Sequence, residues 1–249
     1  MRFFFIASLL FLSTLIEAQV VLEGRIRYKV TQNWSKQLTS LPYISEQRRQ
    51  KIEYMWGHEE GWSEYYNLFF NTAITKFEES DEQAERDDNG YSWRKSAYVL
   101  MRDFSKNTRF EVFEMAGKKL IVEDSLQTME WKVQNELKEV AGHVCMSAVL
   151  EDTLKFQTIV AWFALDIPMS GGPEGYYGLP GMILEIDIND GAKVITADKI
   201  EDKALTTELE APKKPKGKKI TYDQYRKQLS DHVAEKKKLE EPWFWSMRY

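Results

Sequence analysis

Residues 182–200, MILEIDINDGAKVITADKI, decide the fold class, because they read as two strands joined by a tight turn. The even-numbered residues from Met182 to Ile188 are apolar, whereas Glu185 and Asp187 alternate with them. A period of two places alternate side chains on opposite faces of a strand. Asn189-Asp190-Gly191 is a typical hairpin turn, after which residues 192–200 return. The stretch therefore predicts an antiparallel hairpin.

The same alternation extends outward over most of the chain. It is regular from Leu22 to Val30, and it recurs at residues 129–134 and along the face Phe156, Thr158, Val160 and Trp162. Shorter strand-like runs occupy residues 69–77, 96–103, 108–115 and 118–123. Turns this closely spaced favour antiparallel neighbours, since parallel pairs need long crossovers. We therefore predict a mainly β (α+β) fold, with a curved antiparallel sheet or open half-barrel.

Two stretches have helical signals. Ser45 can cap a helix that runs to Trp56, with Ile52, Met55 and Trp56 as its inward edge. The second helix begins after Thr221, which with Gln224 fits a capping box. Its apolar side chains recur at helical spacing. They are Tyr222, Tyr225, Leu229 and Val233.

Composition divides the chain into three ranges. Residues 1–18 are predicted to be a signal peptide, residues 19–211 an antiparallel β domain, and residues 212–249 a basic linker, C-terminal helix and aromatic tail. Pro, Gly and Lys in residues 212–219 are typical of a solvated linker with few contacts across it. The tail rings Trp243, Phe244 and Trp245 either pack back onto the sheet or dock on a partner or membrane interface.

The N-terminus has the pattern of an export signal. Arg2 precedes the apolar run Phe3–Leu12, which is too short to span a bilayer, and Ala18 is a small residue suited to cleavage before Gln19. No cysteine follows the cut, so the chain is not predicted to be a lipoprotein. We expect an exported protein, periplasmic or associated with the outer membrane, without a transmembrane anchor after cleavage.

Composition limits the chemistry. The chain has 249 residues, 34 Lys+Arg against 39 Asp+Glu, a net charge of −5 and one cysteine. A single cysteine excludes an internal disulfide framework and a thiolate-rich metal cluster. Weak negative charge gives no reason to expect nucleic acid. His58-Glu59-Glu60 lacks the second histidine of a zinc helix, and Ser170–Gly175 lacks the Lys-Ser/Thr of a phosphate loop. We therefore assign no catalytic residue, no metal ligand and no cofactor.

Cys145 leaves alternatives open. It could be a nucleophile, a redox sensor or an intermolecular disulfide partner, and with His143 it could supply two metal ligands. A lone cysteine in a strand more often behaves as a small buried hydrophobe.

The corner segment, residues 178–183, is rich in glycine and proline. Gly178 and Gly181 permit backbone angles closed to other residues, and we expect a positive φ at Gly181. Pro180 fixes its own φ and steers Leu179 into an extended shape. The resulting kink is either a corner of a curved sheet or a preformed binding lip. The candidate binding residues are Trp162, Pro168, Gly178, Leu179, Pro180 and Gly181.

This segment also resembles a known family. Gly178-Leu179-Pro180-Gly181-Met182-Ile183 is similar to the signature hexapeptide of the GLPGLI family, with Met182 in place of leucine. Upstream Ala-Trp-Phe, Asp-Ile-Pro and Gly-Pro steps within residues 161–173 resemble the family pattern, as does Trp131 followed by Gly142–Cys145. The resemblance implies an exported protein of diderm bacteria without a settled activity. It also implies a lipoprotein-carrier-like sheet that wraps a hydrophobic element, or a role beside TonB-dependent outer-membrane transport.

These observations lead to one functional hypothesis and two rivals. We expect a non-enzymatic binding or accessory protein for a hydrophobic ligand, a peptide or an outer-membrane (TonB-dependent transport) partner. The first rival is a hydrolase that uses Cys145 or an unrecognised carboxylate pair. The second is a structural component of an outer-membrane complex. A carrier should have an apolar groove, an enzyme converging polar groups, and a complex subunit an exposed apolar patch.

Overall fold

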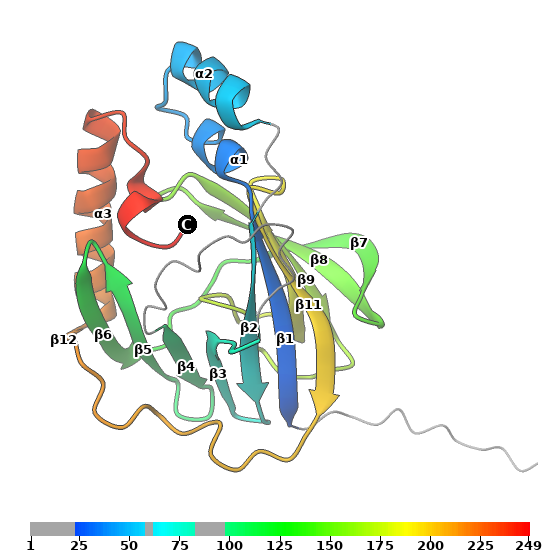
Figure 1. The fold of residues 1–249 in the computed structure, drawn as a ribbon. Helices are drawn as coiled ribbons and strands as arrows, with labels where there is room; N and C mark the ends of the chain where they lie inside the picture. Colours follow the sequence, from blue (N-terminus) through cyan, green and yellow to red (C-terminus); the bar gives the residue numbers. More distant parts are fainter. Residues whose placement is uncertain (1–22, 58–61, 83–97) are drawn as a thin grey trace, which may run out of the picture.

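The computed structural model describes residues 23–57, 62–82 and 98–249 (Figure 1). The predicted signal peptide and the motif that begins at His58 lie outside the described residues. No helix in the described ranges is long and apolar enough to cross a membrane.

The described residues form one sheet of twelve strands, in the order β12-β6-β5-β4-β3-β2-β1-β11-β10-β9-β8-β7. All neighbours are antiparallel except β12 and β6, which are parallel. The strands are β1 (Gly24–Gln32), β2 (Trp62–Phe70), β3 (Ile74–Glu79), β4 (Val99–Asp103), β5 (Thr108–Met115), β6 (Lys118–Ser125), β7 (Lys132–Val140), β8 (His143–Asp152), β9 (Gln157–Ala164), β10 (Met182–Ile188), β11 (Lys193–Asp202) and β12 (Lys218–Ile220). The sheet is curved but not closed, as the fold prediction required.

The opening stretch forms the predicted hairpin. β10 pairs with β11 in antiparallel register, with Ile188 opposite Lys193. Residues 189–192 connect the two strands, and Asn189, Asp190 and Gly191 have left-handed backbone with φ of 52°, 52° and 83°. β1 is also confirmed, since Ile26, Tyr28 and Val30 are buried on one face.

Other strands differ from their predictions. The run at residues 69–77 is two strands, because the Asn71 side chain accepts bonds from the amides of Ala73 and Ile74 and closes a turn. On β9 the core face carries Ile159, Ala161 and Phe163, so Trp162 lies on the opposite, half-buried face. The strand expected at residues 129–134 starts only at Lys132.

The helices are α1 (Trp34–Thr39), α2 (Glu46–Trp56), α3 (Tyr222–Lys238) and the short 3-10 helix η1 (Trp243–Ser246). The α3 capping box is confirmed, with Thr221 Oγ1 accepting from the Gln224 amide at 3.2 Å. α2 is also confirmed, but its expected inward edge is wrong beyond Ile52, since Met55 and Trp56 are 46% and 39% exposed. α1 was not expected from the sequence.

The C-terminal segment, residues 212–249, is part of the core. Trp243 is fully buried and stacks on Tyr249, with 5.8 Å between ring centroids. β12, within and just beyond the expected linker, pairs with Leu120–Val122 of β6. Figure 1 shows α3 and η1 on the concave side of the sheet. The expectation of few contacts across this boundary is therefore wrong, and the tail rings Trp243 and Phe244 pack back onto the sheet.

Candidate ligand-binding cavity

The corner segment is a tightly packed turn. Gly178 has a φ of +94°, and Leu179 is 2% exposed. A Cβ on Gly181 would lie 2.1 Å from the Ala164 carbonyl oxygen, so only glycine fits there. The positive φ expected at Gly181 is wrong, because the left-handed residue is Gly178 and Gly181 is constrained by close approach instead.

The other candidate residues are scattered around this corner. Trp162 is half-buried beneath Lys138, whose Nζ lies 5.0 Å from the ring centroid. Pro168 and Pro180 are exposed. None of the six candidate binding residues lines the cavity described next.

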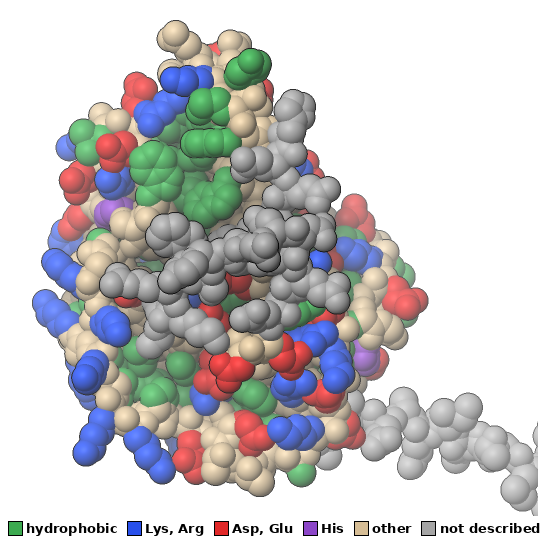
Figure 2. Space-filling model, in the orientation of Figure 1, with side chains coloured by type: hydrophobic (Ala, Val, Ile, Leu, Met, Phe, Trp, Pro, Cys, Tyr) green, Lys and Arg blue, Asp and Glu red, His purple; other side chains and the backbone are tan. Residues whose placement is uncertain are grey.

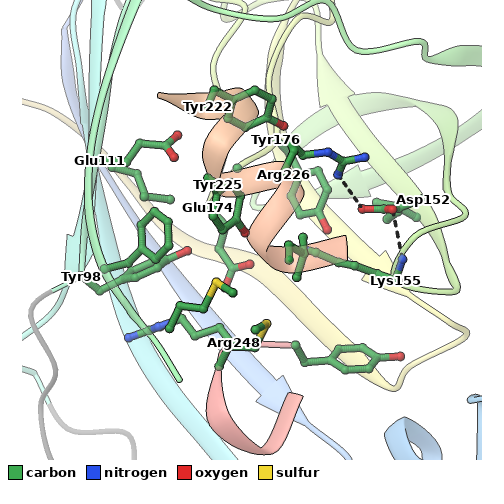
Figure 3. A pocket seen from close by; sticks show the side chains of 18 of the residues that line it. Tyr98, Glu111, Asp152, Lys155, Glu174, Tyr176, Tyr222, Tyr225, Arg226 and Arg248 are labelled. Carbon is green, nitrogen blue, oxygen red and sulfur yellow. Dashed lines mark hydrogen bonds and ion pairs between the residues drawn. The ribbon is translucent and has the colours of Figure 1, made fainter. Parts of the chain in front are cut away.

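A cavity of about 180 Å³ lies between the concave face of the sheet and the C-terminal segment (Figure 3). Strands β4, β5, β8 and β9 contribute to it, as do the loop at Glu174, helix α3 and the last residues of the chain. Its apolar walls include Leu100, Phe113, Met129, Ile159 and Leu229. We call it the tyrosine cavity, after its lining residues Tyr98, Tyr176, Tyr222 and Tyr225.

The tyrosine rings are held in place by aromatic contacts. Tyr225 meets Phe113 of β5 edge to face at 5.1 Å between centroids, which joins α3 to the sheet. Burial raises the pKa of Tyr98, Tyr176 and Tyr225 well above the usual value, because a phenolate would be desolvated there. The three hydroxyls therefore stay protonated through the neutral range.

Two buried carboxylates, Glu111 and Glu174, line the tyrosine cavity (Figure 3). Glu111 Oε1 accepts from Arg102 Nη2 at 2.9 Å and lies 3.7 Å from Arg109 Nη1. Glu174 Oε1 is paired with Lys193 Nζ at 2.5 Å. Burial of Lys193 lowers its pKa, and the charge of Glu174 opposes that effect. Pairing is what allows these charges to be buried.

Arg248 links the C-terminal segment to the cavity wall. Its guanidinium lies 3.7 Å from the Tyr98 ring centroid and donates to Tyr66 Oη at 2.6 Å. Glu174 and Arg248 also line a second cavity of about 200 Å³ beside Trp34 and Phe244. The C-terminal residues thus shape both cavities.

An apolar groove lies at the end of the molecule that carries α2 and η1. Its volume is about 210 Å³, and its lining includes Leu38, Ile52, Met55, Trp56 and Trp245. Figure 2 shows hydrophobic side chains gathered at this end. An exposed apolar surface of this kind is what we expect of the second rival, a structural component of a complex.

Cys145 is packed away from the tyrosine cavity. It is fully buried, and its Sγ donates to the His143 carbonyl at 3.6 Å. Burial raises the thiol pKa to about 11, which removes the thiolate needed for nucleophilic attack. His143 Nδ1 instead contacts Asp166 Oδ2 at 2.7 Å. In the described part of the chain, no three His, Cys, Asp or Glu side chains lie close enough to hold a metal ion.

Sequence reasoning found the α3 stripe that lines the cavity but not its other walls. Glu111 alternates with apolar residues on β5 and reads as a solvent-facing charge. Glu174 and Arg248 lie in irregular segments that have no periodic signal. Their meeting depends on sheet order, which a single sequence does not reveal.

Comparison with known proteins supports the fold and leaves the activity open. Two structures of PNGF-II, in C2 and P21 space groups, align with TM-scores of 0.53 and 0.54 at 14% and 15% identity. They cover 85% of this chain, whereas this chain spans about a third of PNGF-II (33% and 34%). Identity this low shows a shared fold alone. An uncharacterized conserved protein from Thermus thermophilus aligns at 6% identity over 81% of this chain and 92% of its own, with a TM-score of 0.38.

No curated protein matches the chain in sequence. A family model described as "Protein of unknown function (Porph_ging)" matches residues 66–185, slightly less than half of the chain. That range includes the second half of β2, β3 to β9, the corner segment and the start of β10. Over residues 66–185 the chain is therefore similar to a family of unknown function.

Proposed function

We propose that this chain is an exported, non-enzymatic envelope protein of the GLPGLI type that holds a small ligand in the tyrosine cavity. The observation that carries the proposal is the cavity itself, which has aromatic and aliphatic walls and lies between the sheet and α3. Concave, mostly apolar pockets with a few convergent polar groups are the usual form of small-molecule sites. The tyrosines and carboxylates favour an amphipathic ligand over a purely hydrophobic one.

Export is part of the same proposal. Its support is the sequence of residues 2–18, with a basic start, an apolar run and a small residue before the expected cut. We place the mature protein in the periplasm or against the outer membrane. The intact mass of protein isolated from the envelope should correspond to a chain that begins at Gln19.

The hydrolase alternative has less physical support. Cys145 is buried with a raised thiol pKa, so it does not suit a nucleophile. Glu111 and Glu174 are each paired with buried cations, an arrangement typical of structural ion pairs.

Purification from the native envelope, followed by native mass spectrometry, tests the binding function. We expect a bound small molecule that is released on denaturation. Gly175→Trp should weaken its retention, because Gly175 lines the cavity and a Cβ there meets no atom within 4 Å, so a large side chain can be added at the edge of the cavity without backbone strain.

Val144→Trp is the matched control, since Val144 is exposed on β8 and does not line the cavity. It should retain the ligand. Equal retention by the two folded variants would show that the ligand does not occupy the cavity. A protein that carries nothing, in every preparation, would contradict the proposal.

A further inference from the structure

The polar groups of the tyrosine cavity have spare hydrogen-bonding capacity. Within the described residues, the hydroxyls of Tyr98, Tyr176, Tyr222 and Tyr225 make no hydrogen bond to the protein. Each hydroxyl can donate one hydrogen bond and accept others. None of the four hydroxyls is among the fully buried side-chain atoms that lack a partner, and Tyr98, Tyr222 and Tyr225 are half-buried. The hydroxyls are therefore open to the cavity, and an occupant that displaces water can pair with them.

The carboxylates add acceptors to this set. The bonds of Glu111 and Glu174 to Arg102 and Lys193 use only Oε1. The second oxygen of each carboxylate has no hydrogen-bond partner among the described residues. A carboxylate oxygen only accepts, so the matching ligand groups are donors.

The charges around the cavity favour a neutral occupant. A cationic ligand beside Glu111 would meet Arg102 and Arg109, which already surround that carboxylate. Beside Glu174 it would meet Lys193. Glu114, Asp152, Lys155, Arg226 and Arg248 also line the cavity, so acidic and basic side chains are nearly balanced around it. With both signs of charge on the same walls, a charged ligand of either sign meets like charges, whereas a neutral ligand does not.

The size of the cavity fits one six-membered ring. Its volume of about 180 Å³ is close to the roughly 150 Å³ apolar cavity that accommodates benzene in an engineered protein. Aliphatic walls such as Leu100, Ile159 and Leu229 can pack against C–H groups of the ring. The hydroxyls and carboxylates lie around the same space (Figure 3).

We propose that the tyrosine cavity binds one ring of a neutral polyhydroxylated compound, the chemistry of an uncharged sugar residue. This rests on the proposed binding function and names the class of its ligand. Ring hydroxyls supply the donors that Glu111 and Glu174 lack, and they pair with the tyrosine hydroxyls. The ring can belong to a free sugar or to the end of an oligosaccharide.

Calorimetry and ligand-observed NMR with defined probes test this proposal. The neutral probes are hexoses, N-acetylhexosamines and short oligosaccharides of these sugars. The comparison probes are glucosamine as a cation, glucuronate as an anion and cyclohexanol as an apolar ring. We expect at least one neutral sugar to bind, with both charged sugars weaker by tenfold or more and cyclohexanol weaker still. Oligosaccharide binding without monosaccharide binding would assign the ring to a chain end, and it supports the class.

Hydroxyl-deletion variants connect binding to the cavity. Tyr225→Phe and Tyr176→Phe keep the ring and remove one unpaired hydroxyl each, so both should fold and melt at or above the wild-type temperature. Each should weaken sugar binding by roughly 2- to 10-fold, the usual range for one hydrogen bond. Tyr54→Phe is the matched control, because Tyr54 is 87% exposed on α2.

The outcomes separate this inference from the binding function. Cyclohexanol or a charged sugar that binds better than every neutral sugar, and is blocked by Gly175→Trp, would overturn the ligand class while the cavity kept its binding role. Neutral sugars that bind equally to wild type, Tyr225→Phe and Gly175→Trp would place the sugar outside the cavity and overturn the inference. No binding of any probe, together with no ligand from the native envelope, would overturn both proposals.

Discussion

The sequence predicts the corner segment well and the C-terminal segment poorly. The corner, residues 178–183, has the strongest local signal in the chain, and its residues satisfy a backbone constraint at Gly181. The C-terminal segment, residues 212–249, has the composition of an appendage. It nevertheless supplies Trp243 to the core and Arg248 to the cavity.

The difference follows from the range of the contacts. A turn is specified by residues that are neighbours in sequence, so glycine and proline residues predict it. The partners of the C-terminal segment are distant: Arg248 bonds Tyr66, and Tyr249 bonds Asn189. A conspicuous motif can therefore be structural, while an inconspicuous tail can build the site.

The largest effect should come from removing the C-terminal segment. A chain that ends at Ala211 would lose β12, α3 and the buried Trp243, exposing the concave face of the sheet. We expect loss of the cooperative melting transition, measured by circular dichroism and calorimetry. A truncated chain that melts near the full-length temperature would restore the interpretation of residues 212–249 as an appendage.

Point variants can show whether the loss of stability comes from the missing core side chain or from truncation in general. Trp243→Ala should cost about 3–5 kcal/mol, the usual range for a buried tryptophan. Trp245→Ala, two residues on and 56% exposed, should change stability by less than about 0.5 kcal/mol.

Gly181→Val should produce the largest loss within the corner. Its Cβ would overlap the Ala164 carbonyl oxygen, so β9 and the corner must separate. We expect destabilisation of about 3 kcal/mol or more in denaturant unfolding, at the upper end for overpacking. Gly175→Ala is the matched control with no contact, and it should stay near wild type. A Gly181→Val protein as stable as this control would show that the corner can relax.

Much of the sheet could be predicted because its periodicity is local. β1, the β10–β11 hairpin and the start of α3 follow from alternation, turn residues and a capping box. α1 has only six residues, too few for a helical period to register. β12 is formed by lysine-rich residues, and its pairing with β6 is a tertiary contact.

The cavity could not be predicted because its charges violate the usual pattern. Arg102 and Glu111 alternate with apolar residues on adjacent strands, which normally indicates a solvent-facing side. Both are buried, because they pair with each other beneath the C-terminal segment. Only the sheet order and the packing of α3 reveal that face as interior.

Leu179→Ser tests whether the corner is structural or a binding lip. Leu179 is 2% exposed, so removing its side chain should cost about 2–3 kcal/mol by loss of apolar burial. Ligand retention by the folded protein should be unchanged, because Leu179 does not line the tyrosine cavity. A Leu179→Ser protein that melts at the wild-type temperature but no longer retains the ligand would support the interpretation of the corner as a binding lip.

Alkaline pH should weaken the junction between the C-terminal segment and the sheet. The pKa of Tyr225 is raised by burial, so between pH 10 and its folded pKa the unfolded chain releases a proton that the folded chain keeps. Stability from this tyrosine is complete below pH 10 and falls above it, by up to about 1.4 kcal/mol per pH unit. Comparing unfolding of wild type and Tyr225→Phe from pH 9 to 11 isolates this effect. If the free energies of unfolding of the two proteins changed in parallel with pH, the Tyr225 hydroxyl would not be shielded from solvent.

The smallest predicted effect concerns the start of α3. Thr221 Oγ1 accepts from the Gln224 amide, and the Gln224 side chain accepts from the Thr221 amide in return. Thr221→Ala removes half of this capping box and should cost about 1 kcal/mol. Thr221→Ser keeps the hydroxyl and should stay close to wild type.

Because Tyr222 and Tyr225 lie on the first turn, amide hydrogen exchange of residues 222–229 should increase in Thr221→Ala while exchange in β10 stays unchanged. If amide exchange in β10 increased by the same factor, the C-terminal segment and the corner would unfold as one unit. The two regions would then differ only in how clearly their sequences predict them.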